Sequence, residues 1–390
     1  MNPWDDIQRP GFPSLSSGLE ADFVVAGGGF SGLSLAYYLA TLAPAAKTVL
    51  IEAQTLGFGA SGRTGGVVMP GTAAEESSGT ENAHLFLENF LKAEGIGCEW
   101  RMRACSVLSR DAGFAGLSNL SWTDSGTLRV KAVVPGGDLN PGLYLQGLIQ
   151  AAQKRGALIF ESTPALSFER SHQITVRTPS AAIRTKALIL ATNAFNLEKF
   201  AHGRYFFALN TFALATQPVS RDILTSAGWK DERPFYTKEL PYLWGRTTTS
   251  GKIIMGSGLD RYEEAPTPAT AQTRLDDLEA RFHALHPAFK NIKVERRWWG
   301  PLCMPRDRLP RILSDPEEPG VFFLGGYSGH GVALSHLFAN YLARYLCGDE
   351  KALDPIAWAL AYPPREGGAW LKRLKTRLVL WAYQRNWLRP

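Results

Sequence analysis

The sequence contains little cysteine, no secretory leader and no long apolar segment. Its four cysteines, at positions 98, 105, 303 and 347, show no CxxC or metal-type spacing, which argues against a cysteine metal site and a disulfide framework. The opening residues, MNPWDDIQRPGFPSLSSGLEAD, lack the apolar segment of a signal peptide, and no apolar run has the length of a membrane-spanning helix. We therefore expect a protein of the reducing cytoplasm, where cysteines remain thiols.

The chain also lacks net charge outside its C-terminal end. Residues 365–390 hold seven Lys or Arg and one Glu, so this tail carries the whole formal net charge of +6. A balanced body argues against broad nucleic-acid binding. In the tail, Trp and Leu recur on one helical face and basic residues surround it. This pattern leaves two interpretations open: a helix packed on the body, or an interfacial helix that binds an anionic membrane or an acidic partner.

Glycine is abundant, and its first cluster follows a short apolar segment. Residues 22–26 (DFVVA) predict a buried strand, and GGGFSG at 27–32 leads into helical apolar spacing. In such a GxGxxG turn, Gly27 permits the tight turn and Gly29 lets the backbone approach a pyrophosphate. Gly32 lets the helix pack closely on the sheet. The strand–turn–helix context predicts a dinucleotide-binding unit.

The segment after the second strand indicates which dinucleotide is bound. TVLI at 48–51 predicts that strand, and Glu52 directly after it is placed to accept hydrogen bonds from ribose hydroxyls. In a nicotinamide enzyme another crossover helix normally follows, but here the chain enters the glycine-rich loop GFGASGRTGGVV, 57–68. Many backbone N–H groups in such a loop can face an extended pyrophosphate and a flat ring, and Arg63 adds charge. The sequence therefore favours FAD over NAD.

At this point the sequence resembles the FAD-dependent D-amino acid oxidase superfamily. The most similar branch contains the gamma-glutamylputrescine oxidoreductase-like and glycine or sarcosine oxidase-like enzymes. The matching segments follow the family's order, from the N-terminus to about residue 362: RPGFPSL, VVAGGGFSGLSLAYYLA, IEAQTLGFGASGRTGG, GDLNPGLYLQGLIQAAQKRGALIFEST, ALILATNAF, ALATQPV, WWGPLCMPRDRLPRI and FFLGGYSGHGVALS.

The resemblance implies an α/β fold in which two discontinuous domains are interleaved. One is a Rossmann-like FAD-binding domain of the glutathione-reductase type, expected at 1–75, 138–212 and 300–364. The other is a smaller substrate domain with an antiparallel sheet, expected at 76–137 and 213–299. Alternating runs such as TFALATQP and a polar helix near PATAQTRLDDLEARFHALH support this division. Residues 365–390 form the separate basic tail.

The resemblance also implies which residues bind the cofactor. The loop GFGASGRTGG is expected to wrap the pyrophosphate and the edge of the flavin, and a helix starting near Val332 is expected to direct its N-terminus at the flavin ring. The expected cofactor-binding residues are Gly27, Gly29, Phe30, Ser31, Gly32, Glu52, Ala53, Gly59, Ala60, Ser61, Gly62, Arg63, Thr64, Gly65, Gly66, Val67, Ala165, Ala191, Thr192, Gly326, Tyr327, Ser328, Gly329, His330, Gly331 and Val332.

Enzymes of this family oxidise a neutral amine, which delivers hydride from its α-carbon to flavin N5 and leaves an imine that hydrolyses. The protein orients the C–H bond and needs no strong base. The candidate catalytic residues are Tyr242, Arg246, Tyr327 and His330. Arg246 is predicted either to clamp a substrate carboxylate or to pair within the sheet. None of the His residues has a metal or triad spacing, so no metal site is expected.

Two positions depart from the sarcosine oxidase branch. A flavin-linking thiol is expected near Gly300, but Cys303 lies three residues away, so we expect non-covalent FAD. The flavin-facing Lys of that branch falls near Ile254, which weakens any prediction of fast reaction with oxygen.

Taken together, these features predict an FAD-dependent oxidoreductase that oxidises a C–N bond of an amine or amino acid and passes electrons to O2 or an electron carrier. Two alternatives remain: a flavin dehydrogenase of the same fold that donates electrons to a quinone or carrier, and a non-catalytic flavoprotein docked by its basic tail.

Overall fold

The computed structural model describes residues 2–74, 78–110, 117–195, 197, 200–237, 239, 242–260, 266–315 and 317–363. The predicted basic tail lies outside these residues. The strands are β1 (Leu19–Ala26), β2 (Thr48–Ile51), β3 (Val67–Val68), β4 (Arg101–Met102), β5 (Cys105–Ser109), β6 (Trp122–Thr123), β7 (Thr127–Val134), β8 (Gly137–Asp138), β9 (Leu158–Phe160), β10 (Ser167–Arg170), β11 (Ile174–Arg177), β12 (Ala182–Leu190), β13 (Phe206–Pro218), β14 (Phe235–Thr237), β15 (Leu243–Thr247), β16 (Lys252–Asp260), β17 (Val294–Pro305), β18 (Arg311–Ser314) and β19 (Val321–Gly325).

The helices begin and end where the sequence supplies suitable residues. Asn140 caps α3 by accepting hydrogen bonds from Gly142 N and Leu143 N, and Pro141 occupies the first position, where no N–H is needed. The helices are α1 (Phe30–Leu42), α2 (Ala83–Ala93), α3 (Pro141–Lys154), α4 (Arg221–Ser226), α5 (Pro268–Leu285) and α6 (Gly331–Leu346). Short 3-10 turns are η1 (Ala60–Gly62), η2 (Ala201–Tyr205), η3 (Pro287–Phe289) and η4 (Asp354–Leu360).

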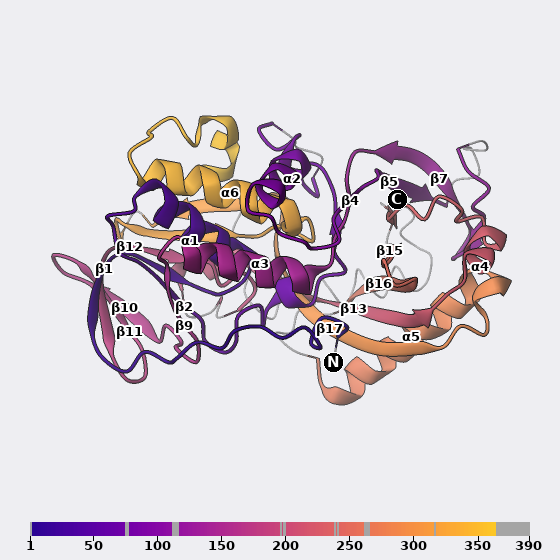
Figure 1. Ribbon diagram of the computed structural model, residues 1–390, viewed down its shortest axis with the longest axis horizontal. Helices are drawn as coiled ribbons and strands as arrows, with labels where there is room; N and C mark the ends of the chain where they lie inside the picture. Colours follow the sequence, from indigo (N-terminus) through magenta and orange to yellow (C-terminus); the bar gives the residue numbers. More distant parts are fainter. Residues whose placement is uncertain are drawn as a thin grey trace.

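The first sheet has a parallel centre, in the order β12-β1-β2-β9, and β19 pairs in parallel with β12. Helices α1, α3 and α6 lie together on one face of this sheet (Figure 1). Strands of such a sheet are buried on both faces, which explains why β2 consists only of buried residues. The predicted α/β class with a Rossmann-like parallel sheet is therefore confirmed.

The second sheet has the order β17-β13-β16-β15-β14-β5-β7-β6 and forms the other half of the molecule (Figure 1). Its pairs are antiparallel except for β14 with β5. Helix α5 packs against β13, β16 and β17. A small third sheet, β3-β8-β4, joins the glycine-rich loop to the chain near residue 138.

The predicted domain boundaries do not coincide with the ends of the observed strands, and one helix packs against elements assigned to the other domain. The boundaries at 212 and 300 fall inside the long strands β13 and β17. Helix α2 lies in a segment assigned to the substrate domain, but its buried Leu87, Phe90 and Leu91 share a core with α1, α3 and α6. The apolar face of α2 is thus buried on the helical layer of the first sheet. The domain division stays a prediction.

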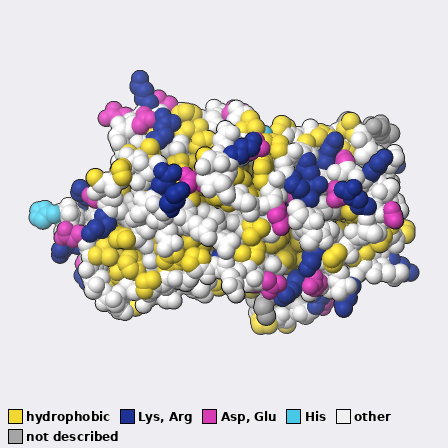
Figure 2. Space-filling view, in the orientation of Figure 1, with side chains coloured by type: hydrophobic (Ala, Val, Ile, Leu, Met, Phe, Trp, Pro, Cys, Tyr) yellow, Lys and Arg dark blue, Asp and Glu magenta, His cyan; other side chains and the backbone are white. Residues whose placement is uncertain are grey.

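Charged side chains of both signs lie on the visible face of the molecule. Figure 2 shows Lys and Arg side chains mixed with Asp and Glu on the visible face, although basic side chains are more frequent over the half that holds β4, β5 and β7. No helix among the described residues has both the length and the apolar character required to cross a bilayer.

A histidine is buried without charge in the helical layer. His336 on α6 has no exposed surface, and its ring nitrogens contact Ser34 Oγ at 2.9 Å and Tyr38 Oη at 2.7 Å, both on α1. Burial lowers the pKa of His336 to about 3. Because an unfolded His has a pKa near about 6.5, the unfolded chain binds more protons between these two values. His336 therefore stabilises the fold above about pH 6.5, and this contribution is lost as the pH falls toward 3.

We predict that His336→Gln reduces the acid sensitivity of the fold. Between pH 7 and pH 5 the wild-type protein should lose about 2 kcal/mol more free energy of unfolding than the variant does. Urea unfolding at the two pH values measures this difference. The same substitution at exposed His172, in the β10–β11 turn, is the control and should leave the acid loss unchanged. Equal acid losses in wild type and His336→Gln would contradict the prediction.

Candidate cofactor and substrate cavity

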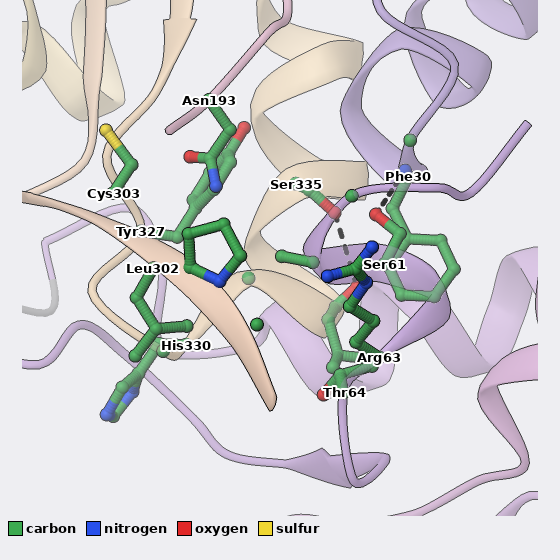
Figure 3. Close-up of a pocket in the computed structure, with 18 of the residues that line it drawn as sticks. Phe30, Ser61, Arg63, Thr64, Asn193, Leu302, Cys303, Tyr327, His330 and Ser335 are labelled. Carbon is green, nitrogen blue, oxygen red and sulfur yellow. Dashed lines mark hydrogen bonds between the residues drawn. The ribbon is translucent and has the colours of Figure 1, made fainter. Parts of the chain in front are cut away.

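A cavity of about 1050 Å³ lies where the two large sheets meet. The first sheet contributes the turns after β1, β2, β12 and β19, and the second contributes residues of β13–β17. Figure 3 shows Phe30, Ser61 and Arg63 on one side of the view and Asn193, Leu302 and Cys303 on the other. In open α/β sheets, ligands bind at the carboxyl ends of parallel strands, which is the edge of the first sheet that opens here.

The turn between β1 and α1 is held in a conformation that suits glycine. Gly27 has φ +118°, and a Cβ there would lie 2.6 Å from the carbonyl oxygen of Ala191. Gly29 is the N-cap of α1 and has no side chain to cap it, so of the first amides of this helix only Phe30 N is bonded by a side chain, that of Ser61, among the described residues. Because Gly29, Phe30 and Ser31 line the cavity, the N-terminal end of α1 opens into it. Such an end attracts anionic oxygen atoms.

Glu52 lines the cavity directly after β2. Its Oε2 accepts a hydrogen bond from Gly28 N at 2.7 Å and its Oε1 accepts one from Gln54 N at 2.9 Å. Burial raises the pKa of Glu52, and these backbone hydrogen bonds act in the opposite direction. The carboxylate thus fixes the glycine turn and faces the place where a ribose is predicted.

The glycine-rich loop carries the half-buried cation of Arg63, whose pKa is raised by the nearby charge of Asp5 but lowered more by burial. Ser61 Oγ accepts a hydrogen bond from Phe30 N at 2.8 Å, which ties the loop to α1. The Arg63 guanidinium lies 4.7 Å from the Phe58 ring centroid and 5.9 Å from that of Trp299. Burial lowers the pKa of Arg63, and within the described part of the chain it forms no ion pair with a carboxylate. A half-buried cation of this kind suits a pyrophosphate.

The loop after β19 brings a second helix start to the cavity. Helix α6 begins at Gly331, one residue before the predicted position, and no side chain caps it. Tyr327 Oη accepts a hydrogen bond from Ser31 Oγ at 3.0 Å, and burial raises the pKa of this phenol, so it stays protonated. His330 Nδ1 lies 3.3 Å from Gly71 O, and desolvation lowers the pKa of His330 to about 4. Its imidazole is therefore uncharged at neutral pH.

Most residues predicted to bind the cofactor line this cavity. They are Gly27, Gly29, Phe30, Ser31, Glu52, Ala53, Gly59, Ala60, Ser61, Arg63, Thr64, Gly65, Val67, Ala165, Ala191, Thr192, Tyr327, Ser328, Gly329, His330, Gly331 and Val332. Tyr242, predicted to be catalytic, and Trp244 also line it. Their contact with FAD or substrate stays a prediction.

Four predicted glycines are not among the lining residues. A Cβ on Gly32 would lie 1.8 Å from Gly27 O, and one on Gly62 would lie 2.3 Å from Gly57 O. Gly66 and Gly326 have φ of +81° and +80°. These positions require glycine because backbone passes close by or turns into the left-handed region. They shape the cavity-forming turns and do not line the cavity themselves.

Arg246 lies outside the cavity lining. It is only 1% exposed, and its Nη1 lies 3.1 Å from Asp138 Oδ1. Its Nε donates to Gly65 O at 2.5 Å, and burial lowers the pKa of Arg246 to about 10. Protein groups thus engage Nε and Nη1, whereas the buried Nη2 has no partner among the described residues. These contacts favour pairing within the protein over a substrate clamp, and the role of Arg246 stays a prediction.

Sequence reasoning missed several groups around the cavity. Trp4 donates its indole N–H to Thr64 O at 2.9 Å, and Arg9 Nη1 donates to Leu56 O at 3.0 Å. Trp298 lines the cavity and donates to Arg63 O at 2.8 Å. Arg308, Glu81, Tyr236 and Ser257 also line the cavity. No local pattern marks these residues, because each reaches the cavity through tertiary contacts.

The lining fits FAD in its charge and its shape. Two helix starts whose N-cap residues supply no side-chain cap, together with the Arg63 cation, complement a two-phosphate bridge, and glycines leave the backbone bare along the turns. No group of three or more His, Cys, Asp or Glu that suits a metal ion occurs among the residues that the structure describes.

Comparisons with known proteins point the same way. The family model "FAD dependent oxidoreductase" (DAO) matches residues 22–345. The chain is 27% identical to the "Probable oxidoreductase OrdL" of Haemophilus influenzae, over 96% of this chain and 93% of that protein. It is 25% identical to the gamma-glutamylputrescine oxidoreductase of Escherichia coli, over 93% and 91%. The crystal structure of glycine oxidase from Geobacillus kaustophilus superposes with a TM-score of 0.69 at 16% identity, covering 89% of this chain and 100% of that one.

Proposed function

Because the chain belongs to the FAD-dependent oxidoreductase family, DAO, we propose that it oxidises the C–N bond of an amine or amino acid. FAD, when bound, supplies the acceptor for the hydride that leaves the substrate carbon and carries its two electrons. The names of two relatives, gamma-glutamylputrescine oxidoreductase and glycine oxidase, support this class of substrate.

The residues that would hold the cofactor are those of the turns on the first sheet. The open start of α1 and the Arg63 cation would receive the phosphates, and Glu52 would receive a ribose. We propose that the flavin is bound without a covalent link. Cys303 lines the cavity but is 1% exposed, and burial raises the pKa of its thiol, which therefore stays protonated and unreactive.

One observation carries the assignment of the substrate: among the described residues, the part of the cavity lined by β14, β15, β16 and the residue before β15 is uncharged and largely aromatic. These lining residues are Tyr236, Thr237, Tyr242, Leu243, Trp244 and Ser257. Aromatic faces and hydroxyl groups of this kind hold an amine in its neutral form or attract a cationic one weakly. They also exclude water from the reacting carbon.

The chain supplies no strongly basic group from its predicted catalytic residues. Tyr327 stays protonated and already accepts a hydrogen bond, and His330 is uncharged with a pKa of about 4. His330 can accept a hydrogen bond from a substrate N–H but holds a proton only weakly. The residues therefore orient a substrate that arrives already deprotonated at nitrogen.

We predict that a suitable amine bleaches the flavin in the absence of oxygen. The measurement is the visible flavin absorption of the purified holoprotein, mixed anaerobically with a panel of primary and secondary amines, amino acids and 2-hydroxy acids. Free FAD with the same panel is the control and should not be bleached. Bleaching by a hydroxy acid alone would contradict C–N oxidation. Bleaching by no substrate, with FAD bound, would favour the non-catalytic alternative.

The electron acceptor separates the two enzymatic alternatives. Ile254, the position where the sarcosine oxidase branch carries a flavin-facing Lys, is fully buried and packs with Trp4 and Trp298. This favours a dehydrogenase that passes electrons to a quinone or carrier. Oxygen uptake after amine reduction would identify an oxidase instead. The docking role of residues 365–390 at a membrane or acidic partner stays a proposal, because the tail lies outside the described residues.

A further inference from the structure

Three successive carbonyl groups of the glycine-rich loop are each bonded by a side-chain N–H from a distant part of the chain. Trp298 Nε1 donates to Arg63 O at 2.8 Å, Trp4 Nε1 donates to Thr64 O at 2.9 Å, and Arg246 Nε donates to Gly65 O at 2.5 Å. The donors come from β17, the N-terminal segment and β15. We call Trp4, Arg246 and Trp298 the carbonyl clasp.

The clasp determines where the next N–H groups point. A trans peptide is planar, so the C=O of one residue and the N–H of the next point in opposite directions. When the carbonyls of Arg63 and Thr64 are bound on one side, the N–H groups of Thr64 and Gly65 face the other side. Both residues line the cavity, and neither N–H has a hydrogen-bond partner within the described residues. Buried N–H groups without partners are rare in folded proteins.

We propose that the carbonyl clasp positions the cofactor by presenting the N–H groups of Thr64 and Gly65 to acceptor oxygens of FAD. Trp4 is then a cofactor-positioning residue although it does not line the cavity. Its ring lies 5.5 Å from the Arg246 guanidinium, and Arg246 is anchored on Asp138, so two of the three donors support each other. The acceptor oxygens belong either to the pyrophosphate or to the carbonyls of the flavin ring.

The donors are buried, which makes the loop orientation rigid. Trp4, Trp298 and Arg246 are 4%, 6% and 1% exposed. If a loop peptide turned, its carbonyl would leave a buried N–H unsatisfied, which is costly. The cofactor therefore meets donors that are already oriented, and binding does not have to order them.

The test is Trp4→Phe, which removes the indole N–H but keeps an aromatic ring in its place. The FAD dissociation constant of the flavin-free protein should rise by about five- to tenfold. Trp229→Phe is the matched control. Like Trp4, Trp229 is buried (2% exposed), and it donates to a backbone carbonyl, Arg233 O, at 2.8 Å. It lies, however, in the core of the second sheet. This variant should lose similar stability and keep the wild-type FAD affinity.

An ADP titration and a second variant show which acceptor the N–H groups bind and whether the effect is specific to the cofactor. Titration with ADP separates the acceptors: weaker binding of both ADP and FAD indicates the pyrophosphate, and weaker binding of FAD alone, with a shifted flavin absorption band, indicates the ring. Trp298→Phe, which frees the neighbouring Arg63 carbonyl, is the second variant and should act in the same direction. Thermal unfolding of each flavin-free protein reports purely structural damage. The proposal is overturned if Trp4→Phe and Trp298→Phe bind FAD as tightly as Trp229→Phe does.

Discussion

Gly27→Ala should weaken FAD binding by about a hundredfold or more, so that the variant purifies without colour. Gly27 has φ +118°, and an added Cβ would lie 2.6 Å from Ala191 O and 2.8 Å from the carbonyl carbon of Ala191. Both atoms belong to the backbone at the end of β12, which pairs with β1. The methyl group can fit only if the two strand ends separate, which displaces the open start of α1.

The measurement is the ratio of FAD to protein after acid precipitation, which releases non-covalent flavin into the supernatant. Gly156→Ala is the matched control. Gly156 has φ +93°, and an added Cβ there meets nothing within 4 Å. It therefore carries the backbone strain of about 1–2 kcal/mol without the steric conflict, and this variant should remain yellow. A yellow Gly27→Ala protein with wild-type FAD content would show that the turn does not form the cofactor site.

The βαβ unit could be predicted because its determinants are local. A strand, a GxGxxG turn, a helix and a carboxylate after the next strand occur within 19–52, and their geometry follows from glycine conformation and hydrophobic periodicity. Strand β2 has the predicted bounds, and β1 starts three residues earlier than predicted. That extension depends on pairing with β12, whose partner residues begin at Ile183. Such pairing has no local signal.

The position of Arg246 shows where the same reasoning stops. Residues 244 and 246 alternate along β15 and residue 242 directly precedes this strand, so periodicity predicts that the three side chains share one face. Tyr242 and Trp244 do line the cavity. Arg246 does not line it, because its guanidinium bonds the carbonyl of Gly65 instead. Periodicity predicts the face of a strand and not where along that face a cavity ends. The end is determined here by a loop that lies 181 residues away in the sequence.

The lack of a local signal also explains why the sequence did not reveal the contact of Trp4 with the loop or the pairing of Asp138 with Arg246. Asp138 lies in the family-like segment that begins at Gly137, but nothing in that segment indicates an ion pair, and Asp138 meets Arg246 only after β8 pairs with β4 and the second sheet packs beside them. Ion pairs between distant segments are created by topology. They can be found in a structure and not in a single sequence.

This cluster gives the largest expected effect on stability. Asp138 has no exposed surface, and its carboxylate binds three guanidinium groups: Arg101 at 2.5 Å, Arg103 at 2.8 Å and Arg246 at 3.1 Å. We predict that Asp138→Asn lowers the free energy of unfolding by about 3–5 kcal/mol. The amide keeps the shape of the side chain but removes the negative charge that is bound to all three cations, which then repel one another in a poorly solvated site.

Urea unfolding measures this loss, and Glu169→Gln is the matched control. Glu169 pairs with Arg177, but their side chains are 61% and 56% exposed, so this change should alter stability by less than about 1 kcal/mol. A loss no greater than the control's would contradict the prediction.

A double-mutant cycle tests whether repulsion is the cause. Arg246→Met alone leaves Asp138 bound to Arg101 and Arg103, so it should destabilise the protein less than Asp138→Asn does. Added to Asp138→Asn, the same change removes one of three mutually repelling cations. The double variant should therefore be more stable than the sum of the two single losses predicts. Strict additivity would instead mean that Asp138→Asn acts through lost hydrogen bonds, including those that orient Arg246 toward the Gly65 carbonyl.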